Sequence, residues 1–371
     1  MDNATPIRVG VLGATGYIGQ PYREEMRAVS DTKIVALCAR RRDLLEAAAQ
    51  EDAADLATTD WRAVAEHPDV NLVVVATPDA LHHEAVMACA AAGKHIICEK
   101  PVGKDATEAA EMWEAYRAHD KLFHFVPFWT RYADIFVRAK EIVASGALGQ
   151  IRGVVYRWHN PRPAGMPLTW RDNAELSAGG SIADVGSHAY DTVAWILGEQ
   201  ATRVLVHADT VTADKADLGD INLQEALDWG AAPAAHHQHQ RGTTPDYANI
   251  AWEFTGGAVG MLMVSHASFL RKGLCPELEL HGTQASLAIN RVTGDVIWGL
   301  PDQAPEVRER ISDQGLGNRF EKFVFPAMRC LLSGDTPPEH PTLEHGWHVQ
   351  CFTDAALQSA QSGSWVNVPG N

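Results

Sequence analysis

The chain has 371 residues, enough for two domains with substantial cores. Its formal net charge of −16 argues against binding to nucleic acid or to an anionic membrane surface, because both require clustered Lys and Arg. Six scattered cysteines without paired short spacings indicate reduced thiols, not disulfides or a zinc site. No apolar run is long enough for a membrane span or a signal peptide, so we expect a cytoplasmic protein.

A glycine-rich turn follows the first predicted strand, which is the apolar run 7–12. Its glycines are spaced Gly13-x-x-Gly16-x-x-Gly19, one residue longer than the commonest dinucleotide fingerprint. Glycine suits such a turn because the backbone bends tightly and must approach a pyrophosphate closely. A following helix would direct its first N–H groups at the phosphates. The predicted cofactor contacts here are Gly13, Thr15, Gly16, Tyr17 and Ile18.

The second predicted strand, residues 33–38, bears on the choice of dinucleotide. NAD sites usually place an acidic residue near the end of this strand, where it accepts hydrogen bonds from a ribose hydroxyl, whereas arginine suits a 2′-phosphate. Ala39 stands at that position, and Arg40, Arg41 and Arg42 follow it. The sequence therefore favours NADP and leaves NAD possible, with Ala39, Arg40 and Arg41 as predicted ribose-side residues.

Strands and helices alternate up to residue 127, which predicts a parallel sheet covered by helices. The strand ends at Gly13, Ala39, Thr77 and Glu99 should line one edge, where ligands bind in open α/β sheets. The remaining strands predicted in this region are 71–76, 95–98 and 122–126, and the helices are 79–92 and 105–118.

After a predicted helix over 133–145, the chain becomes rich in strands with glycine-containing turns. We therefore assign residues 1–127 to a dinucleotide-binding α/β domain and residues 128–371 to an α+β domain for substrate binding and oligomerisation. The strands predicted in the second domain are 151–158, 203–208, 247–254, 259–265, 278–282 and 285–289.

Alternating apolar residues predict an exposed apolar sheet face in the second domain. Helices or a second subunit usually cover such a face, so we predict a homodimer or homotetramer. The residues assigned to this face are Trp252, Phe254, Val259, Met261 and Met263.

Two short segments carry chemistry. Glu99-Lys100-Pro101 directly follows the apolar run 95–98, which places a lysine at a strand end. The glycine-rich segment 179–191 contains Asp184 and His188 four residues apart, hence on one face of a helix. Lys, Asp and His together can handle protons. With a nucleotide site upstream, they indicate an enzyme that interconverts alcohols and carbonyls.

These motifs together resemble the Gfo/Idh/MocA oxidoreductase family. The resemblance implies an N-terminal Rossmann domain and a C-terminal α+β domain with a large, mostly antiparallel open sheet. It assigns catalysis to Lys100, Asp184 and His188, and it implies cofactor contacts from Thr77, Pro78, His82, Glu99 and Lys100. The matching residues are Thr77-Pro78, His82, Glu99-Lys100-Pro101, the segment 179–191, Asp354-Ala355-Ala356 and Ser359. The departures are the longer glycine turn, Asp79 where asparagine is common, and Ala39 in place of an acid.

The residue chemistry fits a hydride transfer. His188 is the natural general base for a substrate hydroxyl, because the unperturbed pKa of histidine lies near neutrality. Lys100 can hydrogen-bond the same oxygen, or polarise a carbonyl in the reverse direction. Asp184 either binds a substrate hydroxyl or tunes the two basic groups.

Aromatic and basic residues near these motifs are substrate candidates. Tryptophans stack on sugar rings, although aromatic residues are as often buried for packing alone. An arginine pair would also admit a carboxylated or sulfonated sugar. The predicted substrate residues are Phe128, Arg157, Trp158, Trp170 and Arg171, with Lys100, Asp184 and His188.

Three functions remain open: a dehydrogenase or reductase acting on a sugar, cyclitol or related polyol; a redox-neutral glycoside-cleaving enzyme that works through a 3-keto intermediate; and a non-enzymatic nucleotide or sugar sensor. Metal binding by Asp184, His188 and Asp191 is disfavoured because a lysine would lie nearby. The histidines at 236–239 lie in a predicted exposed loop, so we predict no metal site.

Overall fold

The computed structural model describes residues 6–219, 221–229, 237–312 and 315–370. It divides into two compact units. The first contains residues up to 127, 222–224 and 317–347, and the second contains 128–221, 225–316 and the chain from 348 onward. Residues 317–347, which the sequence analysis grouped with the second domain, therefore pack within the first unit.

The first unit is built on a parallel six-stranded sheet with strand order β3-β2-β1-β4-β5-β6. The four residues of β4 are all fully buried valines and leucine, as a strand covered on both faces requires. The strand order reverses between β1 and β4, and ligands bind at such a switch point. The strands are β1 (Ile7–Leu12), β2 (Thr32–Cys38), β3 (Leu56–Thr58), β4 (Leu72–Val75), β5 (His95–Cys98) and β6 (His124–Phe125).

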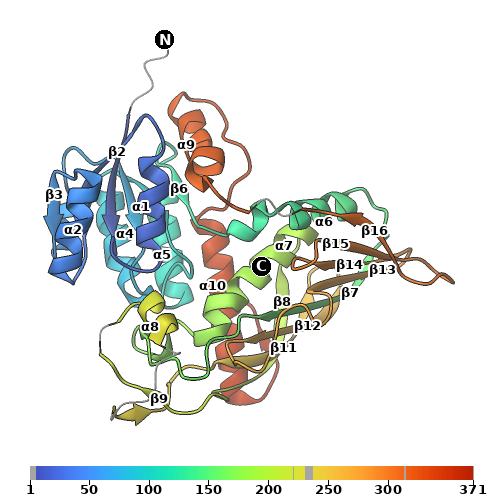
Figure 1. Ribbon diagram of the computed structural model, residues 1–371. Coiled ribbons are helices and arrows are strands. Elements are labelled where there is room, and N and C mark those ends of the chain that lie inside the picture. The colour runs from blue at the N-terminus through green and yellow to red at the C-terminus, as the bar shows by residue number, and fades with distance from the viewer. Residues whose placement is uncertain (1–5, 220, 230–236, 313–314, 371) are drawn as a thin grey trace. The chain divides into compact units, whose positions relative to one another are not determined.

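Helices connect these strands and pack against the sheet (Figure 1). Asp105 begins α5 by accepting hydrogen bonds from the backbone N–H groups of Thr107 and Glu108, both at 2.9 Å. The helices are α1 (Gly19–Arg27), α2 (Arg42–Asp52), α3 (Trp61–Ala65), α4 (His82–Ala91), α5 (Ala106–Arg117) and α9 (Phe325–Leu332), with short 3-10 and π turns at Asp79–Leu81 and Phe320–Val324.

The late segment 317–347 is anchored to α1. The ring of Phe320 packs edge-on against Tyr22, with centroids 5.0 Å apart, and both side chains are fully buried. Arg319 forms an ion pair with Glu25 and lies over the Tyr22 ring. These contacts join segments almost 300 residues apart in the chain, so no local pattern indicates them.

The second unit contains a nine-stranded sheet with order β16-β15-β14-β13-β7-β12-β11-β8-β17. Every neighbouring pair is antiparallel except β7 and β12, which are parallel. The predicted fold class, a parallel α/β domain followed by a large and mostly antiparallel sheet, is thus confirmed. The strands are β7 (Ile151–His159), β8 (Ala201–Asp209), β11 (Tyr247–Phe254), β12 (Val259–Ser265), β13 (Leu278–Gly282), β14 (Ser286–Asn290), β15 (Asp295–Gly299), β16 (Glu306–Arg310) and β17 (Val366–Asn367), with a separate pair β9 (Lys215–Ala216) and β10 (His239–Gln240).

Helices α7 and α10 run beside β8, β11 and β12 in Figure 1. Phe352 of α10 stacks on Tyr190 of α7 and also contacts Trp252 of β11, which shows which sheet face the helices cover. Arg131 and Asp191 form a buried ion pair that ties α7 to the segment before α6. The helices are α6 (Asp134–Ala144), α7 (Ser187–Leu197), α8 (Leu223–Trp229) and α10 (Leu343–Ser362), with short 3-10 helices at Trp129–Tyr132 and Trp170–Asp172 and a π-helix at Ile182–Gly186.

The five residues predicted to form one apolar face in fact lie on two faces. Trp252 is opposite Gly260 in the β11–β12 register, whereas Met261 is opposite Ala251. Because side chains alternate along a strand, Trp252 and Phe254 point to the helix-covered face, and Val259, Met261 and Met263 point to the other. The exposed fractions agree, at 1% for Trp252 and 53% for Met261. The prediction was wrong because the hairpin register, which the sequence does not show, places the even-numbered residues of β11 and the odd-numbered residues of β12 on opposite faces.

Candidate active site

The glycine turn after β1 is fixed by close backbone contacts. Gly13 has a φ of +80°, and a Cβ there would lie 2.3 Å from the carbonyl oxygen of Ala76, after β4. A Cβ on Gly19 would lie 2.2 Å from the oxygen of Gly13. The packing of the protein itself thus requires these two glycines.

Gly16 differs from its two neighbours in the turn. A Cβ there would meet only the oxygen of Gly13, at 3.2 Å, so nothing else in the structure explains the absence of a side chain. The buried hydroxyl of Thr77, at the neighbouring strand end, has no hydrogen-bond partner among the described residues. An open glycine at the start of a helix and an unsatisfied hydroxyl both fit a bound dinucleotide phosphate.

The same turn is tied to the end of β2. The backbone N–H groups of Gly13 and Ala14 donate to the carbonyl oxygen of Cys38 at 2.9 and 3.1 Å. Ala39 is buried and brings no carboxylate to this edge, and the exposed Arg40 follows it. Arg41 stands at the N-cap of α2. Glycine turn and predicted ribose-side residues therefore share one edge of the sheet.

His82 links the ends of β4 and β5. It is fully buried at the start of α4. Its Nδ1 lies 3.0 Å from the oxygen of Pro101 and its Nε2 lies 2.9 Å from the oxygen of Thr77. Burial lowers the pKa of this imidazole, so the neutral ring donates to one of the two carbonyls at a time. His82 holds together two loops that the sequence analysis assigned to the cofactor.

The carboxylate of Glu99 is also held from two sides. The buried hydroxyl of Tyr22, on α1, donates to its Oε1, and the backbone N–H of Lys100 donates to its Oε2 at 3.2 Å. Tyr22 therefore connects the helix after the glycine turn with the loop that carries Lys100. Tyr22 was not predicted from the sequence, because it belongs to no motif and its partner lies 77 residues away.

In the second unit, Asp184 is surrounded by cations. It sits in the π-helix before α7, and such one-turn irregularities occur often at functional sites. Arg162 lies 3.1 Å and Arg171 lies 3.7 Å from its carboxylate oxygens. Nε2 of His266 lies 3.1 Å from Oδ2, and burial lowers the pKa of His266. Arg171 was a predicted substrate residue, whereas Arg162 and His266 were missed.

His188 is the second residue of α7, and two aromatic side chains hold its ring. Trp158 stacks on it with centroids 5.5 Å apart and ring planes 25° apart. Phe128 packs edge-on against it at 6.1 Å. Both aromatic residues were predicted to contact substrate. Both are mostly buried, so in this structure they form the wall that orients the imidazole.

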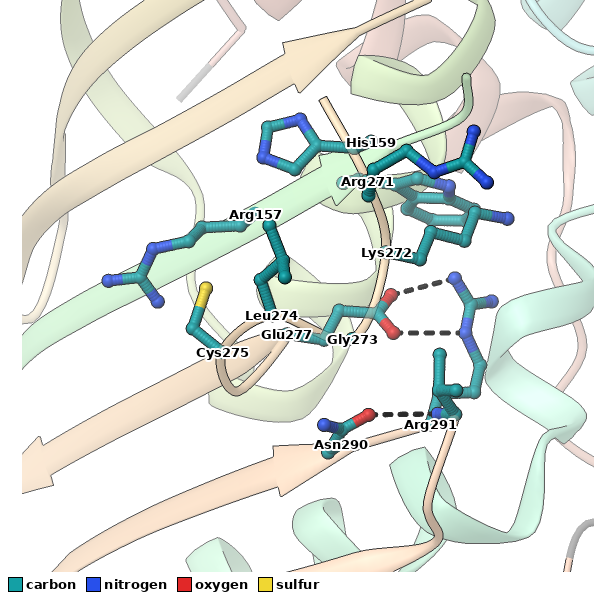
Figure 2. A pocket seen from close by; sticks show the side chains of 12 residues that line it. Arg157, His159, Arg271, Lys272, Gly273, Leu274, Cys275, Glu277, Asn290 and Arg291 are labelled. Carbon is teal, nitrogen blue, oxygen red and sulfur yellow. Dashed lines mark hydrogen bonds and ion pairs between the residues drawn. The ribbon is translucent and has the colours of Figure 1, made fainter. Parts of the chain in front are cut away.

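The other predicted substrate residues fall in two places. The guanidinium of Arg171 lies 4.4 Å above the ring of Trp170, which places Trp170 beside the Asp184 cluster. Arg157 pairs with Glu279 at 2.6 Å and lines a pocket together with Trp158 (Figure 2). Lys100 belongs to the first unit, and Asp184 and His188 belong to the second.

Among the described residues, no three or more His, Cys, Asp or Glu side chains form a cluster that could hold a metal ion. Of the histidines at 236–239, His236 lies outside the described residues. Within the same part of the chain, no helix combines the length and apolarity needed to cross a bilayer.

Two family models match the chain. One, described as an oxidoreductase family with an NAD-binding Rossmann fold, matches residues 7–126, and the GFO/IDH/MocA C-terminal domain model matches residues 136–288. A levoglucosan dehydrogenase of Pseudarthrobacter phenanthrenivorans is 26% identical over 394 residues, covering 98% of each chain. A myo-inositol 2-dehydrogenase of Thermotoga maritima is 30% identical over 286 residues, covering 77% of this chain and 76% of that protein.

A solved structure of a levoglucosan dehydrogenase in complex with NADH and levoglucosan is similar in fold. Its TM-score is 0.80, it covers 98% of this chain and 99% of that chain, and the sequence identity is 24%. The likeness extends over both units of the present structure, each of which has its counterpart fold there.

The contrast between Gly13 and Gly16 gives a testable prediction. Gly16→Ala should change the free energy of unfolding by less than about 1 kcal/mol but weaken dinucleotide binding by about tenfold or more, because the added methyl group fills only the open side of the turn. Gly13→Ala should destabilise the fold by about 2 kcal/mol or more, because it combines a positive φ with a backbone clash. Thermal unfolding and fluorescence titration with NADH and NADPH measure both effects. Equal stability losses in the two variants would contradict this division of roles.

Proposed function

Because this chain belongs to the Gfo/Idh/MocA family of oxidoreductases, we propose that it transfers a hydride between a nicotinamide dinucleotide and a carbinol carbon of a sugar, cyclitol or related polyol. The observation that carries the proposal is the open glycine turn at the β1–β4 switch point, on the same edge as the loop that carries Lys100. The sugar and cyclitol dehydrogenases among its relatives support the substrate class.

The proposed roles follow from the contacts of each residue. The nicotinamide, when bound, supplies or accepts the hydride. His188 removes the proton of the substrate hydroxyl, and the stacked Trp158 fixes the plane of its ring. Lys100 donates a hydrogen bond to the same oxygen and stabilises its developing negative charge. Asp184 holds Arg162 and Arg171 in place, which suits a residue that orients substrate-binding groups more than a free base.

Substitution of the two proposed proton-handling residues tests this mechanism. Lys100→Ala and His188→Ala should each lower turnover by about 10²–10⁴-fold and should be less than additive when combined, because both act on one proton transfer. Lys121→Ala and His119→Ala, both at exposed positions, are matched controls that should retain turnover. The measurement is single-turnover hydride transfer with a substrate found by screening sugars and cyclitols.

Full activity of His188→Ala at every pH would exclude His188 as the base. The stoichiometry of the same assay also separates the proposed function from the alternatives. A dehydrogenase accumulates one reduced nicotinamide per product, a redox-neutral glycoside-cleaving enzyme accumulates none while forming product, and a sensor forms no product.

For the cofactor, we infer a preference for NADP over NAD. The support is local: Ala39 offers no carboxylate to a ribose hydroxyl, and the exposed Arg40 follows it at an edge tied to the glycine turn. The NADH bound in the solved relative is a property of that protein, whose sequence is 24% identical.

Arg40→Ala should weaken NADPH binding by about 1–3 kcal/mol and leave NADH binding nearly unchanged, because only NADPH carries the phosphate that the guanidinium would contact. Ala39→Asp should shift the preference toward NADH, since it restores the acid that accepts from the ribose hydroxyls. Calorimetric titration of both cofactors decides the matter. Tighter NADH binding by the unmodified protein would refute the inference.

We also infer a homodimer or homotetramer formed through the open face of the nine-stranded sheet. A continuous cross-strand row on this face contains Leu205, Ala251, Met261, Val155, Glu279, Ala288, Ile297 and Val307. Met261 and Val307 are 53% and 46% exposed, as large apolar residues on a subunit interface are before assembly.

Light scattering at micromolar concentration should give twice or four times the chain mass of 40.4 kDa. Met261→Glu should shift the protein toward monomers, because it puts an unpaired charge among the apolar residues Leu205, Ala251 and Val155 of this row. Met263→Glu tests the same face one pair along. A monomeric mass for the unmodified protein would count against this assembly.

The thiols support a reducing compartment, and we infer a cytoplasmic location. All six cysteines are free, and four are buried. Burial raises the pKa of Cys38 and Cys351 to about 11 and that of Cys89 to about 12, so these thiols stay protonated and unreactive.

A further inference from the structure

A pocket opens in the second unit where β7 ends (Figure 2). Its walls come from the end of β7, from the loop between β12 and β13, and from the turn after β14. The space between these walls is about 340 Å³, a volume that includes the solvent at its open mouth, so the pocket has room for a small substituent and not for a whole sugar. The lining residues on which the argument depends are Arg157, Trp158, Arg271, Lys272, Glu277 and Arg291.

This pocket is rich in positive charge although the chain as a whole carries −16. Arg291 forms an ion pair with Glu277, with two hydrogen bonds of 2.7 and 3.2 Å. Arg157 forms an ion pair with Glu279 at 2.6 Å. Arg271 and Lys272 have no carboxylate within ion-pair distance among the described residues. Two exposed cations that form no ion pair among the described residues therefore line this cavity, with the Glu277 carboxylate as the nearest opposing charge on Lys272.

The surroundings of Lys272 disfavour its charged form. Burial lowers the pKa of its ammonium, and the Arg291 guanidinium lowers that pKa further, while Glu277 opposes both effects. Figure 2 shows Lys272 and Arg291 on one side of the pocket, with the Arg157 guanidinium pointing away on the other. An anion placed between Lys272 and Arg271 would offset the repulsion between the positive charges and favour the charged form of Lys272.

The pocket shares a wall with the candidate base. The ring of Trp158 stacks on His188, and the Arg291 guanidinium lies 4.4 Å from the centre of the same ring. Arg162, which pairs with Asp184, also acts electrostatically on Lys272. Trp158 thus belongs both to the pocket lining and to the surroundings of His188, and Arg162 acts on both Asp184 and Lys272.

We propose that this pocket binds an oxyanion substituent of the substrate, so that the preferred substrate is a carboxylated or phosphorylated sugar or cyclitol. The inference rests on the proposed function. Arg271 and Lys272 provide the charge-assisted hydrogen bonds, and Arg291, fixed by Glu277, forms the cationic wall behind them. This reassigns the anion recognition considered for Arg157 and Arg171, because both of those guanidinium groups already face carboxylates.

The experiment compares each neutral sugar or cyclitol with its uronate and its monophosphate. The unmodified enzyme should show a kcat/KM at least about tenfold higher for one of the anionic forms at low salt, and the preference should shrink as ionic strength rises. Arg271→Gln and Lys272→Gln should each lower the anionic-to-neutral ratio by about tenfold. Arg310→Gln removes the same charge from an arginine that is 76% exposed on β16, and it should leave the ratio unchanged.

Calorimetry separates this proposal from the proposed function. Binding of uronates, sugar phosphates and inorganic phosphate is measured on the unmodified protein and on the Arg271→Gln, Lys272→Gln double variant. If the anions bind only the unmodified protein but no sugar supports hydride transfer, the pocket stands and the function fails.

Equal kcat/KM for neutral and anionic partners, together with equal anion binding by both proteins, overturns the pocket while the function stands. Phosphate that binds in the pocket without competing with the anionic sugar also overturns it, because the site would then serve a separate effector. Selectivity for the uronate over the monophosphate, or the reverse, identifies the source of the oxyanion.

Discussion

The close approach of two backbones at the switch point constrains everything else in the first unit. The carbonyl oxygen of Ala76 occupies the space that a side chain on residue 13 would need, so β1 and β4 can end side by side only with glycine there. Hydrogen bonds from the turn to Cys38 add the end of β2, and His82 adds the loop after β5. Four strand ends are thereby fixed to one another without a ligand. A nicotinamide site built on such an edge is largely formed before the cofactor arrives, which reduces the entropic cost of binding.

The second unit is organised around charge. Asp184 and Asp191 lie within two helical turns of each other, and each forms ion pairs with arginine. Asp191 pairs with the buried Arg131, and Asp184 pairs with Arg162 and Arg171. Removing one partner of such a pair leaves a buried charge without compensation, so the start of α7, and with it the position of His188, depends on both partners being present. The aromatic wall of Trp158 and Phe128 then sets the orientation of the ring.

Much of this architecture could be predicted from the sequence, because strand and helix periodicity are local properties. The strands at 7–12, 95–98, 247–254, 259–265 and 278–282 have the predicted limits. Long-range pairings could not be predicted. Tyr22 meets Glu99, and Phe320 returns to α1, through contacts that leave no periodic trace.

The same limit explains the error on the sheet face. The alternation of side chains within one strand is visible in the sequence. Which residues of two neighbouring strands share a face depends on the register of their hairpin. Here the register places Trp252 and Met261 on opposite faces. In the candidate site, the sequence motif points to Asp184 and His188 as candidates, whereas nothing in the sequence indicates the partners that surround Asp184. Arg162 and His266 reach it from separate segments of the chain.

Strand β7 carries two surfaces at once. Tyr156 and Trp158 point toward the helices and His188, while Val155 and Arg157 point to the open face of the sheet. Point substitutions can therefore alter the aromatic side chains beside His188 or the open face of the sheet separately, as long as the length of the strand is kept. A single inserted or deleted residue would exchange the two sets and damage both surfaces together. Homologous proteins with this sheet should therefore tolerate substitutions along β7 but not insertions or deletions within it. Changes in chain length should occur in the loops on either side of the strand.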